Sequence, residues 1–274
     1  MEPKSNESFG GKLESVRKFG HTIDFGKAAG DYAKHRAGFP DSFFERLETM
    51  GIIGAGMCAL DLGTGTGAVA RGMARKGLEV TGLDKSSALM EQAKILDAEA
   101  GVAIRYVERT AEATGFDDRS LDIVSAGQCW HWFKRDAAAL EARRILKPGG
   151  HLVVCHFDWL VLPGNLCDLT EDLIRKYNPA WNLGGRWRYY PWIGDLADAG
   201  FTRLQSFSFD EETPYTHEAW RGRVRASAGI GASSMSAERI AAFDAELADI
   251  LAEKFPEPMT VLHRIYAAIG AAPG

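Results

Sequence analysis

Between residues 57 and 157 the chain alternates short apolar runs with helical segments, and this alternation constrains the fold more than any other feature. The apolar runs are MCALDLG, LEVTGLD, VAIRYVERT, LDIVSAG and HLVVCHF. The helical segments are AVARGMARKG, SALMEQAKILDAEAG and RDAAALEARRILK, the last stopped by Pro148 and Gly149. Strands that alternate with helices through short loops form a parallel sheet covered by helices on both faces. The pattern predicts a doubly wound α/β fold.

Beyond Phe157 the regularity lapses into an aromatic-rich segment before strand-like and helical runs resume. These later runs are PWIGDLADAGF, TRLQSFSF, HEAWRGRVRASAG, SAERIAAFDAELADILAEKF and TVLHRIYAAIG. We therefore expect a Rossmann-like, mostly parallel seven-stranded sheet whose last strand, residues 260–269, runs antiparallel. Insertions at 158–190 and 210–256 are expected to form a helical and aromatic cap.

The N-terminal segment divides into two parts. Residues 1–24 are polar and lack an apolar period, so we expect a mobile arm before a single domain of residues 25–274. Residues 25–40 have helical spacing up to Gly38, Phe39 and Pro40, and a second helix is expected to begin at Asp41.

Composition excludes several classes of protein. The chain has 274 residues, 46% of them hydrophobic, and a formal net charge of -5, so it favours neither disorder nor binding to polyanions. No run approaches the ~20 apolar residues of a spanning helix, and the first residues lack the apolar core of a signal peptide. We expect a cytoplasmic protein with no nucleic-acid or membrane partner. The four cysteines show no C-x-x-C spacing, and no metal site is expected.

The strongest motif is ALDLGTGTG, residues 59–67, in which an apolar strand enters a loop of alternating glycines. Such glycines allow a tight turn at a strand end, where doubly wound sheets bind cofactors. Asp61, just before the first glycine, is unsuited to pyrophosphate, which needs positive surroundings. It suits a ligand with an amino group and a sulfonium. Asp84 ends the next strand, where a carboxylate can accept both hydroxyls of a ribose.

A second glycine pattern, GAGMCA at residues 54–59, matches the dinucleotide fingerprint G-x-G-x-x-A. That fingerprint must follow a strand and open a helix, whereas this one follows a helix and opens a strand. A nicotinamide-dependent oxidoreductase is therefore the weaker alternative.

The motifs ALDLGTGTG, GLD at 82–84, RTAEATGF at 109–116, LDIVSAGQCWHWF and ARRILKPGG resemble the class I S-adenosylmethionine-dependent methyltransferases. More narrowly, they resemble the small-molecule branch called methyltransferase type 11, over roughly residues 25 to 160. The resemblance implies that the glycine loop wraps the methionine part of the cofactor, that Asp61 lies near its amino group and that Asp84 holds the ribose. It implies that Ala111 and Glu112 border the adenine and that Gln128 faces the methionine.

The N-terminal helix carries a further part of the resemblance, since DYAKHRAGFP matches a Y-x-x-x-R-x-x-(F/Y)-P stretch of this branch. Tyr32 and Arg36 are four residues apart and share one helical face. Arg36 could meet the cofactor carboxylate and Tyr32 could cover the sulfonium, which would make this helix a lid. A surface arginine stacked on a tyrosine is the alternative. The complete set of expected cofactor-binding residues is Tyr32, Arg36, Asp61, Gly63, Thr64, Gly65, Gly67, Asp84, Lys85, Ala111, Glu112 and Gln128.

All seven tryptophans lie between residues 130 and 220, which places the aromatic acceptor side after the cofactor half. His131 follows the fourth strand and could act as a general base, or could only line the wall of a pocket. The expected acceptor-side residues are Trp130, His131, Trp132, Trp187 and Tyr190.

We therefore expect a methyltransferase that moves a methyl group from S-adenosylmethionine to O, N or S of a small, aromatic or apolar acceptor, leaving S-adenosylhomocysteine. The alternatives are an RNA methyltransferase and a non-catalytic module that binds S-adenosylmethionine. A monomer or a homodimer fits the sequence equally.

Overall fold

The computed structural model of the chain describes residues 38–181 and 192–274. The predicted arm of residues 1–24, most of the predicted lid helix 25–40 and the end of the first cap insertion lie outside the described residues. Four predicted site residues, Tyr32, Arg36, Trp187 and Tyr190, lie outside them too. The predictions on these parts stay predictions.

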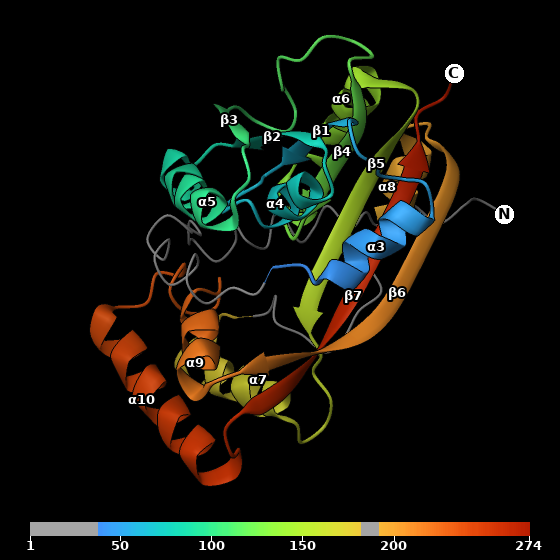
Figure 1. Cartoon of the computed structure of the whole chain (residues 1–274). Coiled ribbons are helices and arrows are strands. Elements are labelled where there is room, and N and C mark those ends of the chain that lie inside the picture. Colours follow the sequence, from blue (N-terminus) through green and yellow to red (C-terminus); the bar gives the residue numbers. More distant parts are fainter. Residues whose placement is uncertain (1–37, 182–191) are drawn as a thin grey trace, which may run out of the picture.

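Seven strands form one sheet in the order β3-β2-β1-β4-β5-β7-β6 (Figure 1). The strands are β1 (Cys58–Leu62), β2 (Glu79–Asp84), β3 (Arg105–Glu108), β4 (Leu121–Gly127), β5 (Leu146–Trp159), β6 (Thr202–Tyr215) and β7 (Met259–Ala271). Strands β1 to β5 pair in parallel, whereas β7 runs antiparallel to β5 and β6. The predicted doubly wound, mostly parallel sheet with an antiparallel last strand is confirmed.

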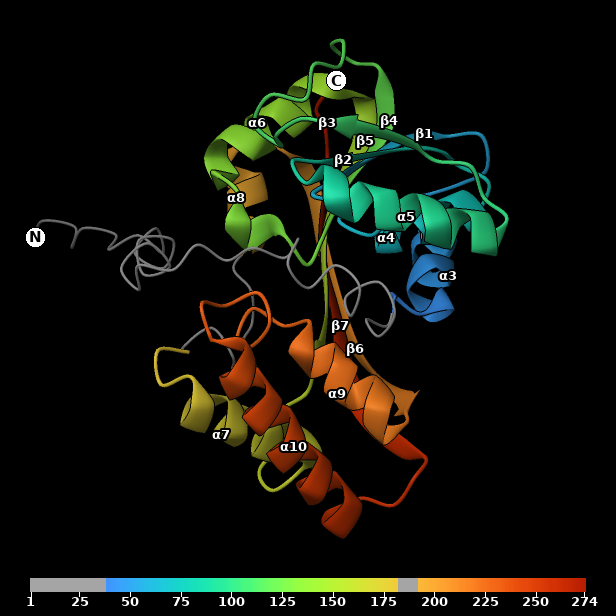
Figure 2. The same cartoon turned by 90° about the vertical axis from the view of Figure 1, so that its left-hand side faces the viewer.

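Helices cover both faces of this sheet (Figure 2). They are α3 (Asp41–Thr49), α4 (Ala68–Arg75) and α5 (Ser87–Ala100) on one face, and α6 (Arg135–Ile145) and α8 (Trp192–Asp198) on the other. Alternate residues of β5 enter two separate cores, since Leu152 and Val154 pack with α6 and α8 while Val153 and Cys155 pack with α3 and α4. This alternation follows from the pleat of a strand that is buried on both faces.

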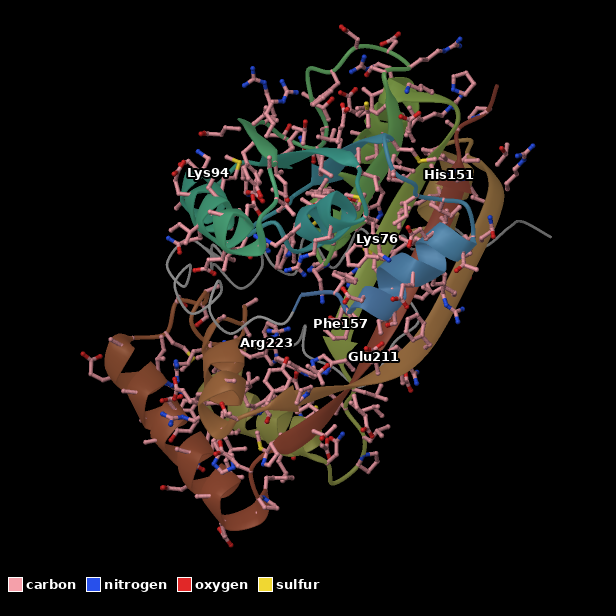
Figure 3. The ribbon with its side chains drawn as sticks, in the orientation of Figure 1. Lys76, Lys94, His151, Phe157, Glu211 and Arg223 are labelled. Atoms are coloured by element: carbon pink, nitrogen blue, oxygen red, sulfur yellow. The ribbon has the colours of Figure 1, made fainter. Side chains whose placement is uncertain are left out.

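The cap consists of α7 (Leu166–Tyr177), α9 (His217–Arg225) and α10 (Ala237–Lys254), which gather at one end of the long strands β5, β6 and β7 (Figure 1). Its core includes Trp220 and Phe243, each 0% exposed. Figure 3 places Arg223 of α9 and Phe157 of β5 where the cap meets the sheet. The Arg223 guanidinium lies 4.7 Å from the centre of the Trp159 ring.

The strands extend further into the cap than expected, so both predicted insertion boundaries need correction. β5 continues to Trp159 and β6 continues to Tyr215, rather than ending before residues 158 and 210. The charged residues after Phe209 belong to the edge strand, where Asp210 pairs with Arg264 of β7 at 2.6 Å. Charged side chains are tolerated there because an edge strand keeps one side in solvent.

Gly72 makes close packing of α4 on α3 possible, and its replacement tests that contact. A Cβ atom at Gly72 would overlap the buried Phe44 ring, so Gly72→Ala is expected to lower the free energy of unfolding by about 1–3 kcal/mol. At Gly194 of α8, no atom of the described residues lies within 4 Å of the equivalent position. Gly194→Ala is therefore expected to raise stability by up to about 1 kcal/mol. Urea denaturation of both variants checks the signs, and a neutral Gly72→Ala would contradict the packing.

Candidate active site

The glycine loop connects β1 to α4 at the carboxyl end of the parallel strands. Gly63, Gly65 and Gly67 have φ angles of 59°, 55° and 77°, in the left-handed region that glycine adopts without steric cost. The Gly65 amide donates a hydrogen bond to Oδ2 of Asp84 at 2.9 Å, which ties the loop to the end of β2. The expected tight turn at a strand end is confirmed.

Asp61 is the buried carboxylate of this site, with 2% of its surface exposed. Ser125 of β4 donates its hydroxyl to Oδ1 of Asp61 at 2.7 Å. Burial raises the pKa of Asp61 to about 6, against the opposing effect of the Ser125 hydrogen bond. In the same turn the buried Thr64 side chain also hydrogen-bonds Asp61 and opposes the rise of its pKa. A buried carboxylate fits a ligand that carries a cationic hydrogen-bond donor.

Asp84 lies one strand away and organises the loop around it. Its Oδ1 accepts from the Ser86 amide at 2.9 Å, and its Oδ2 accepts from the Gly65 amide at 2.9 Å. A carboxylate has about four lone-pair positions, so two bonds leave room for two hydroxyl donors. The next residue, Lys85, is exposed. In the register of β1 and β2, Asp61 lies opposite Gly82, which brings both acids to the same edge of the sheet.

The predicted adenine and methionine positions follow β3 and β4 at this edge. Ala111 is buried, and half-buried Glu112 accepts a hydrogen bond from the Lys134 amide at 2.9 Å. Gln128 has a φ of 64° and donates its side-chain amide to the Phe157 carbonyl of β5. These residues lie at the expected edge, and their contact with a cofactor stays a prediction.

Trp130 is a core residue, which corrects the expectation that it faces an acceptor. The ring is 0% exposed and packs edge-on against Phe133 with 5.9 Å between centroids. Its Nε1 donates to Oδ2 of Asp195 on α8 at 2.9 Å. A short 3-10 turn, Trp130–Trp132, directs this ring inward, so an aromatic run after a strand does not place every ring at the site.

The next two residues, His131 and Trp132, stay half-buried at the end of β4. Their rings lie 4.6 Å apart between centroids. The His131 ring also lies 5.8 Å from that of His156, a β5 residue that the sequence reasoning missed. A half-buried imidazole is accessible to an acceptor, so the burial of His131 is compatible with a base. That role stays a prediction.

Polar residues inside otherwise apolar strands were the signal that the sequence reasoning passed over. Ser125 interrupts LDIVSAG and His156 interrupts HLVVCHF, and both are buried. A buried polar side chain needs a hydrogen-bond partner, and the partner of Ser125 is Asp61.

A second group of residues that the sequence did not reveal supports the glycine loop through hydrogen bonds. Asp97 of α5 accepts from Arg71 at 2.9 Å and from the Tyr106 hydroxyl at 2.7 Å. Arg71 also donates to the Thr66 carbonyl at 2.8 Å. The three side chains come from α4, α5 and β3, so no local sequence pattern could have joined them.

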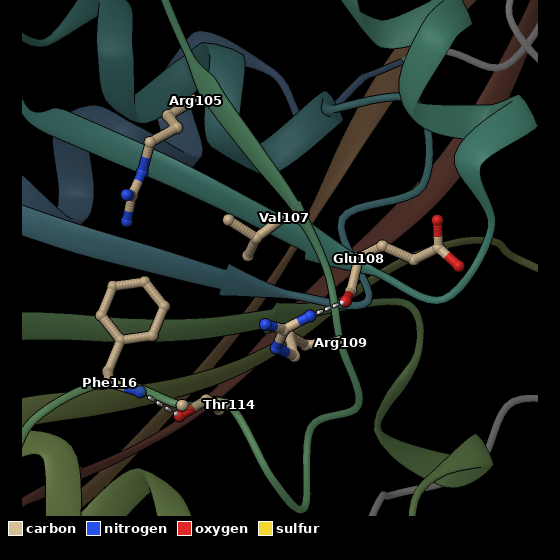
Figure 4. A pocket seen from close by; sticks show the side chains of 7 residues that line it. Arg105, Val107, Glu108, Arg109, Thr114 and Phe116 are labelled. Atoms are coloured by element: carbon tan, nitrogen blue, oxygen red, sulfur yellow. Dashed lines mark hydrogen bonds between the residues drawn. The ribbon is translucent and has the colours of Figure 1, made fainter.

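A hollow of about 320 Å³ lies at the edge strand β3. Its lining residues are Arg105, Val107, Glu108, Arg109, Thr114, Gly115 and Phe116. Figure 4 shows the Arg105 and Phe116 side chains on one side of β3 and the Glu108 carboxylate directed to the other. None of the predicted site residues that the structure describes lines it, so the candidate site rests on the strand-end carboxylates instead.

The upstream pattern GAGMCA runs from the connection after α3 into β1, so it opens a strand and not a helix. This placement removes the structural context that the dinucleotide fingerprint requires.

Comparisons with known proteins agree with this geometry. Residues 60–154 match the family model described as a methyltransferase domain. An uncharacterized methyltransferase of Mycobacterium tuberculosis is 33% identical over 131 residues, 48% of this chain and 51% of that protein. A ubiquinone biosynthesis O-methyltransferase of Alkalilimnicola ehrlichii is 38% identical over 96 residues, 34% of this chain and 39% of that enzyme. The chain thus spans about half the length, or less, of these curated relatives.

Among solved structures, the phosphoethanolamine N-methyltransferase 2 of Haemonchus contortus, in complex with S-adenosyl-L-methionine, superposes with a TM-score of 0.53. The superposition covers 92% of this chain and 61% of that one at 18% identity, and this likeness shows the fold alone.

The fold and the glycine-loop site define a Rossmann-like methyltransferase domain. The match to that domain extends over residues 60–154. Within the described residues, no helix combines the length and the apolar character needed to cross a membrane.

Proposed function

We propose that this protein transfers a methyl group from S-adenosylmethionine to O, N or S of a small-molecule acceptor. The observation that carries the proposal is the pair of carboxylates, Asp61 and Asp84, at adjacent strand ends with the glycine loop hydrogen-bonded between them. The ubiquinone biosynthesis O-methyltransferase among the relatives supports a small-molecule acceptor. When bound, S-adenosylmethionine supplies an activated methyl group on sulfur.

Different residues of the chain would bind different parts of this cofactor. Asp61, as a buried carboxylate, would neutralise the amino group of the cofactor, and the cation would in turn favour the ionised form of Asp61. Asp84 already accepts hydrogen bonds from two backbone amides, and its remaining lone pairs would accept hydrogen bonds from the ribose hydroxyls. The main source of rate is orientation, because displacement at carbon needs the nucleophile held at about 3–3.5 Å from the methyl group.

The acceptor side is expected at the end of β4. His131 and Trp132 are half-buried there, and the predicted acceptor residues Trp187 and Tyr190 would add to this side from the cap. The cap helices gather at the far end of the long strands β5 and β7 (Figure 1). An apolar and aromatic surround of this kind suits a small planar molecule.

Isothermal titration calorimetry with S-adenosylhomocysteine and with NAD⁺ tests the cofactor. We expect one S-adenosylhomocysteine site per chain and no heat from NAD⁺. Binding of NAD⁺ alone would overturn the proposal in favour of an oxidoreductase.

Release of S-adenosylhomocysteine in the presence of a panel of small hydroxyl, amine and thiol compounds tests the transfer. Turnover of any of them supports a small acceptor. Tight cofactor binding without turnover would point to a non-catalytic module, and RNA binding that weakens steeply with salt would point to an RNA methyltransferase.

A further inference from the structure

We propose that Arg71, Asp97 and Tyr106 are positioning residues that hold the glycine loop in its cofactor-binding conformation and thereby set the affinity for S-adenosylmethionine. The inference rests on the proposed methyl transfer and deepens it by naming residues outside the predicted cofactor contacts on which cofactor binding depends. A loop that is ordered before its ligand arrives binds more tightly, because less conformational entropy is lost on binding.

The glycine loop is fixed from two sides. On one side the Gly65 amide donates to Oδ2 of Asp84 at 2.9 Å. On the other side the Thr66 carbonyl accepts from Nη2 of Arg71 at 2.8 Å. The next residue, Gly67, has a φ of 77° and is the position at which the loop becomes α4. Arg71 therefore holds the peptide group at which the chain turns from the loop into the helix.

The Arg71 guanidinium is itself held by α5. Its Nε donates to Oδ1 of Asp97 at 2.9 Å, and the Nη2 that contacts the loop also donates to the Ala93 carbonyl at 3.3 Å. The side chains of Arg71 and Asp97 are only 13% and 6% exposed, so this ion pair is shielded from solvent. The planar fork of a guanidinium suits simultaneous bonds to a carboxylate and to backbone carbonyls.

Tyr106 completes the network from the edge strand β3. Tyr106 lies opposite Gly82 of β2 in the sheet register. A Cβ atom at Gly82 would lie 2.6 Å from the Tyr106 ring, and a Cβ atom at Gly67 would lie 2.6 Å from its hydroxyl oxygen. Two glycines thus make room for a ring that crosses β2 and reaches the end of the glycine loop.

The Tyr106 hydroxyl fixes the carboxylate that orients the arginine. It donates to Oδ2 of Asp97 at 2.7 Å, while Oδ1 of the same carboxylate accepts from Arg71. Burial and the Asp97 carboxylate raise the pKa of Tyr106, so its hydroxyl stays protonated and remains a donor. The chain of contacts therefore runs from β3 through α5 and α4 to the loop backbone.

The expected effect of this network falls on binding. If the loop kept its binding conformation only about a tenth of the time without the network, the observed affinity would fall about tenfold. The network contacts the loop in the same way before and after methyl transfer, so its loss should raise KM for S-adenosylmethionine and leave kcat nearly unchanged.

The first test is calorimetry with S-adenosylhomocysteine, well below the temperature of unfolding. We expect roughly tenfold weaker binding in Arg71→Gln. Tyr106→Phe keeps the ring over Gly82 and loses one hydrogen bond, so we expect a loss of roughly threefold in a variant that still folds. Wild-type affinity in Tyr106→Phe and in any folded Arg71→Gln protein would overturn the positioning role.

Arg221→Gln is the matched control. Arg221 of α9 donates from Nε to Oδ1 of Asp244 on α10 at 3.1 Å, so the same substitution removes a contact between two helices within the cap. Its affinity for S-adenosylhomocysteine should stay within about twofold of the wild type, even where its stability falls. A loss equal to that of Arg71→Gln would mean that loosening any helix pair weakens binding, which would also overturn the proposal.

The second test observes the loop in the ligand-free protein, through the ¹H–¹⁵N signals of the Gly65 and Gly67 amides. We expect these signals to shift or broaden in Arg71→Gln and Tyr106→Phe, to stay unchanged in Arg221→Gln, and to sharpen in all variants at saturating S-adenosylhomocysteine. Unchanged loop signals in Arg71→Gln, with only its stability lowered, would show that the network acts on the fold alone. If the wild type does not bind S-adenosylhomocysteine, the methyl-transfer proposal fails, whereas the ligand-free loop signals still decide whether the network positions the loop.

Discussion

The Asp61→Asn variant is expected to bind S-adenosylhomocysteine about 100-fold more weakly than the wild type, equivalent to about 2.7 kcal/mol. Asp61 is 2% exposed, and the proposed partner of its carboxylate is the amino group of the ligand. Loss of one member of a buried charged hydrogen-bonded pair costs about 1.5–3 kcal/mol or more. Calorimetry at pH 8, where the wild-type carboxyl is ionised, measures the difference.

The pH dependence of binding gives the same prediction a second readout. Because burial raises the pKa of Asp61 to about 6, the ligand-free site is protonated below that pH. Binding of an ammonium group then requires loss of that proton, so affinity should fall by up to about tenfold per pH unit below pH 6. Asp61→Asn should abolish this dependence. A wild-type affinity that is flat between pH 5 and 7 would contradict the role of Asp61.

The same variant should be at least as stable as the wild type at pH 8. The pKa of Asp61 is raised from 3.8 to about 6 in the folded protein. The contribution of this carboxyl to the free energy of unfolding is therefore complete below pH 3.8 and is lost as the pH rises through 6. The loss amounts to about 3 kcal/mol, which a neutral amide avoids. Urea denaturation at pH 5 and pH 8 measures the change.

Asp122→Asn is the matched control. Asp122 lies on β4 and accepts from the Cys58 amide at 2.9 Å and from Lys147 at 2.8 Å, at the end of the strands remote from the glycine loop. Its replacement should lower stability modestly and leave S-adenosylhomocysteine affinity within about twofold. An equal loss of affinity in both variants would mean that Asp61 acts only on the fold.

The Trp220→Ala variant is expected to lower the free energy of unfolding by about 3–5 kcal/mol. Trp220 is 0% exposed, packs edge-on against Trp159 at 5.3 Å and donates its Nε1 to the Thr170 hydroxyl at 3.2 Å. Its removal leaves a large cavity between α7 and α9 and takes one donor from the Thr170 hydroxyl, which still donates to the Leu166 carbonyl at 2.8 Å. Hydrogen exchange should show that the protection lost lies in the cap, with β1, β2 and β4 largely unaffected.

Leu162→Ala serves as the control for the cap, because Leu162 is 43% exposed on the connection from β5 to α7. It should cost less than about 0.5 kcal/mol. Affinity for S-adenosylhomocysteine should remain near the wild-type value in both variants. A Trp220→Ala loss below 1 kcal/mol would contradict the account of the cap core.

Much of the fold could be predicted because each strand–helix step carries its own local signal. The apolar strands, their glycine stops and the antiparallel last strand followed from periodicity, and β1, β2 and β4 begin and end close to the predicted positions. The ends of β5 and β6 did not, because residues such as Asp210 and Glu211 resemble a loop in sequence and are held in the strand by pairing with β7. Such pairing is long-range and leaves no local pattern.

The candidate site, like the fold, could be predicted only in part. Asp61, Asp84 and the glycine loop lie at consecutive strand ends, and topology alone brings them to one edge. Trp130 was wrongly placed because only the tertiary packing against Asp195 turns its ring into the core. The tryptophan-rich segment therefore builds cores as well as the expected acceptor side. Trp159 and Trp181 both donate to the buried Glu171 in the cap, at 3.2 and 3.0 Å.

A crystal structure of the complex with S-adenosylhomocysteine tests the central claim most directly. The account predicts the ligand across the carboxyl ends of β1 and β2, with its ribose hydroxyls at about 2.5–3.0 Å from Asp84 and its amino group at about 2.7–3.2 Å from Asp61. Density for the ligand elsewhere, such as in the hollow beside Arg105 and Phe116, would contradict it.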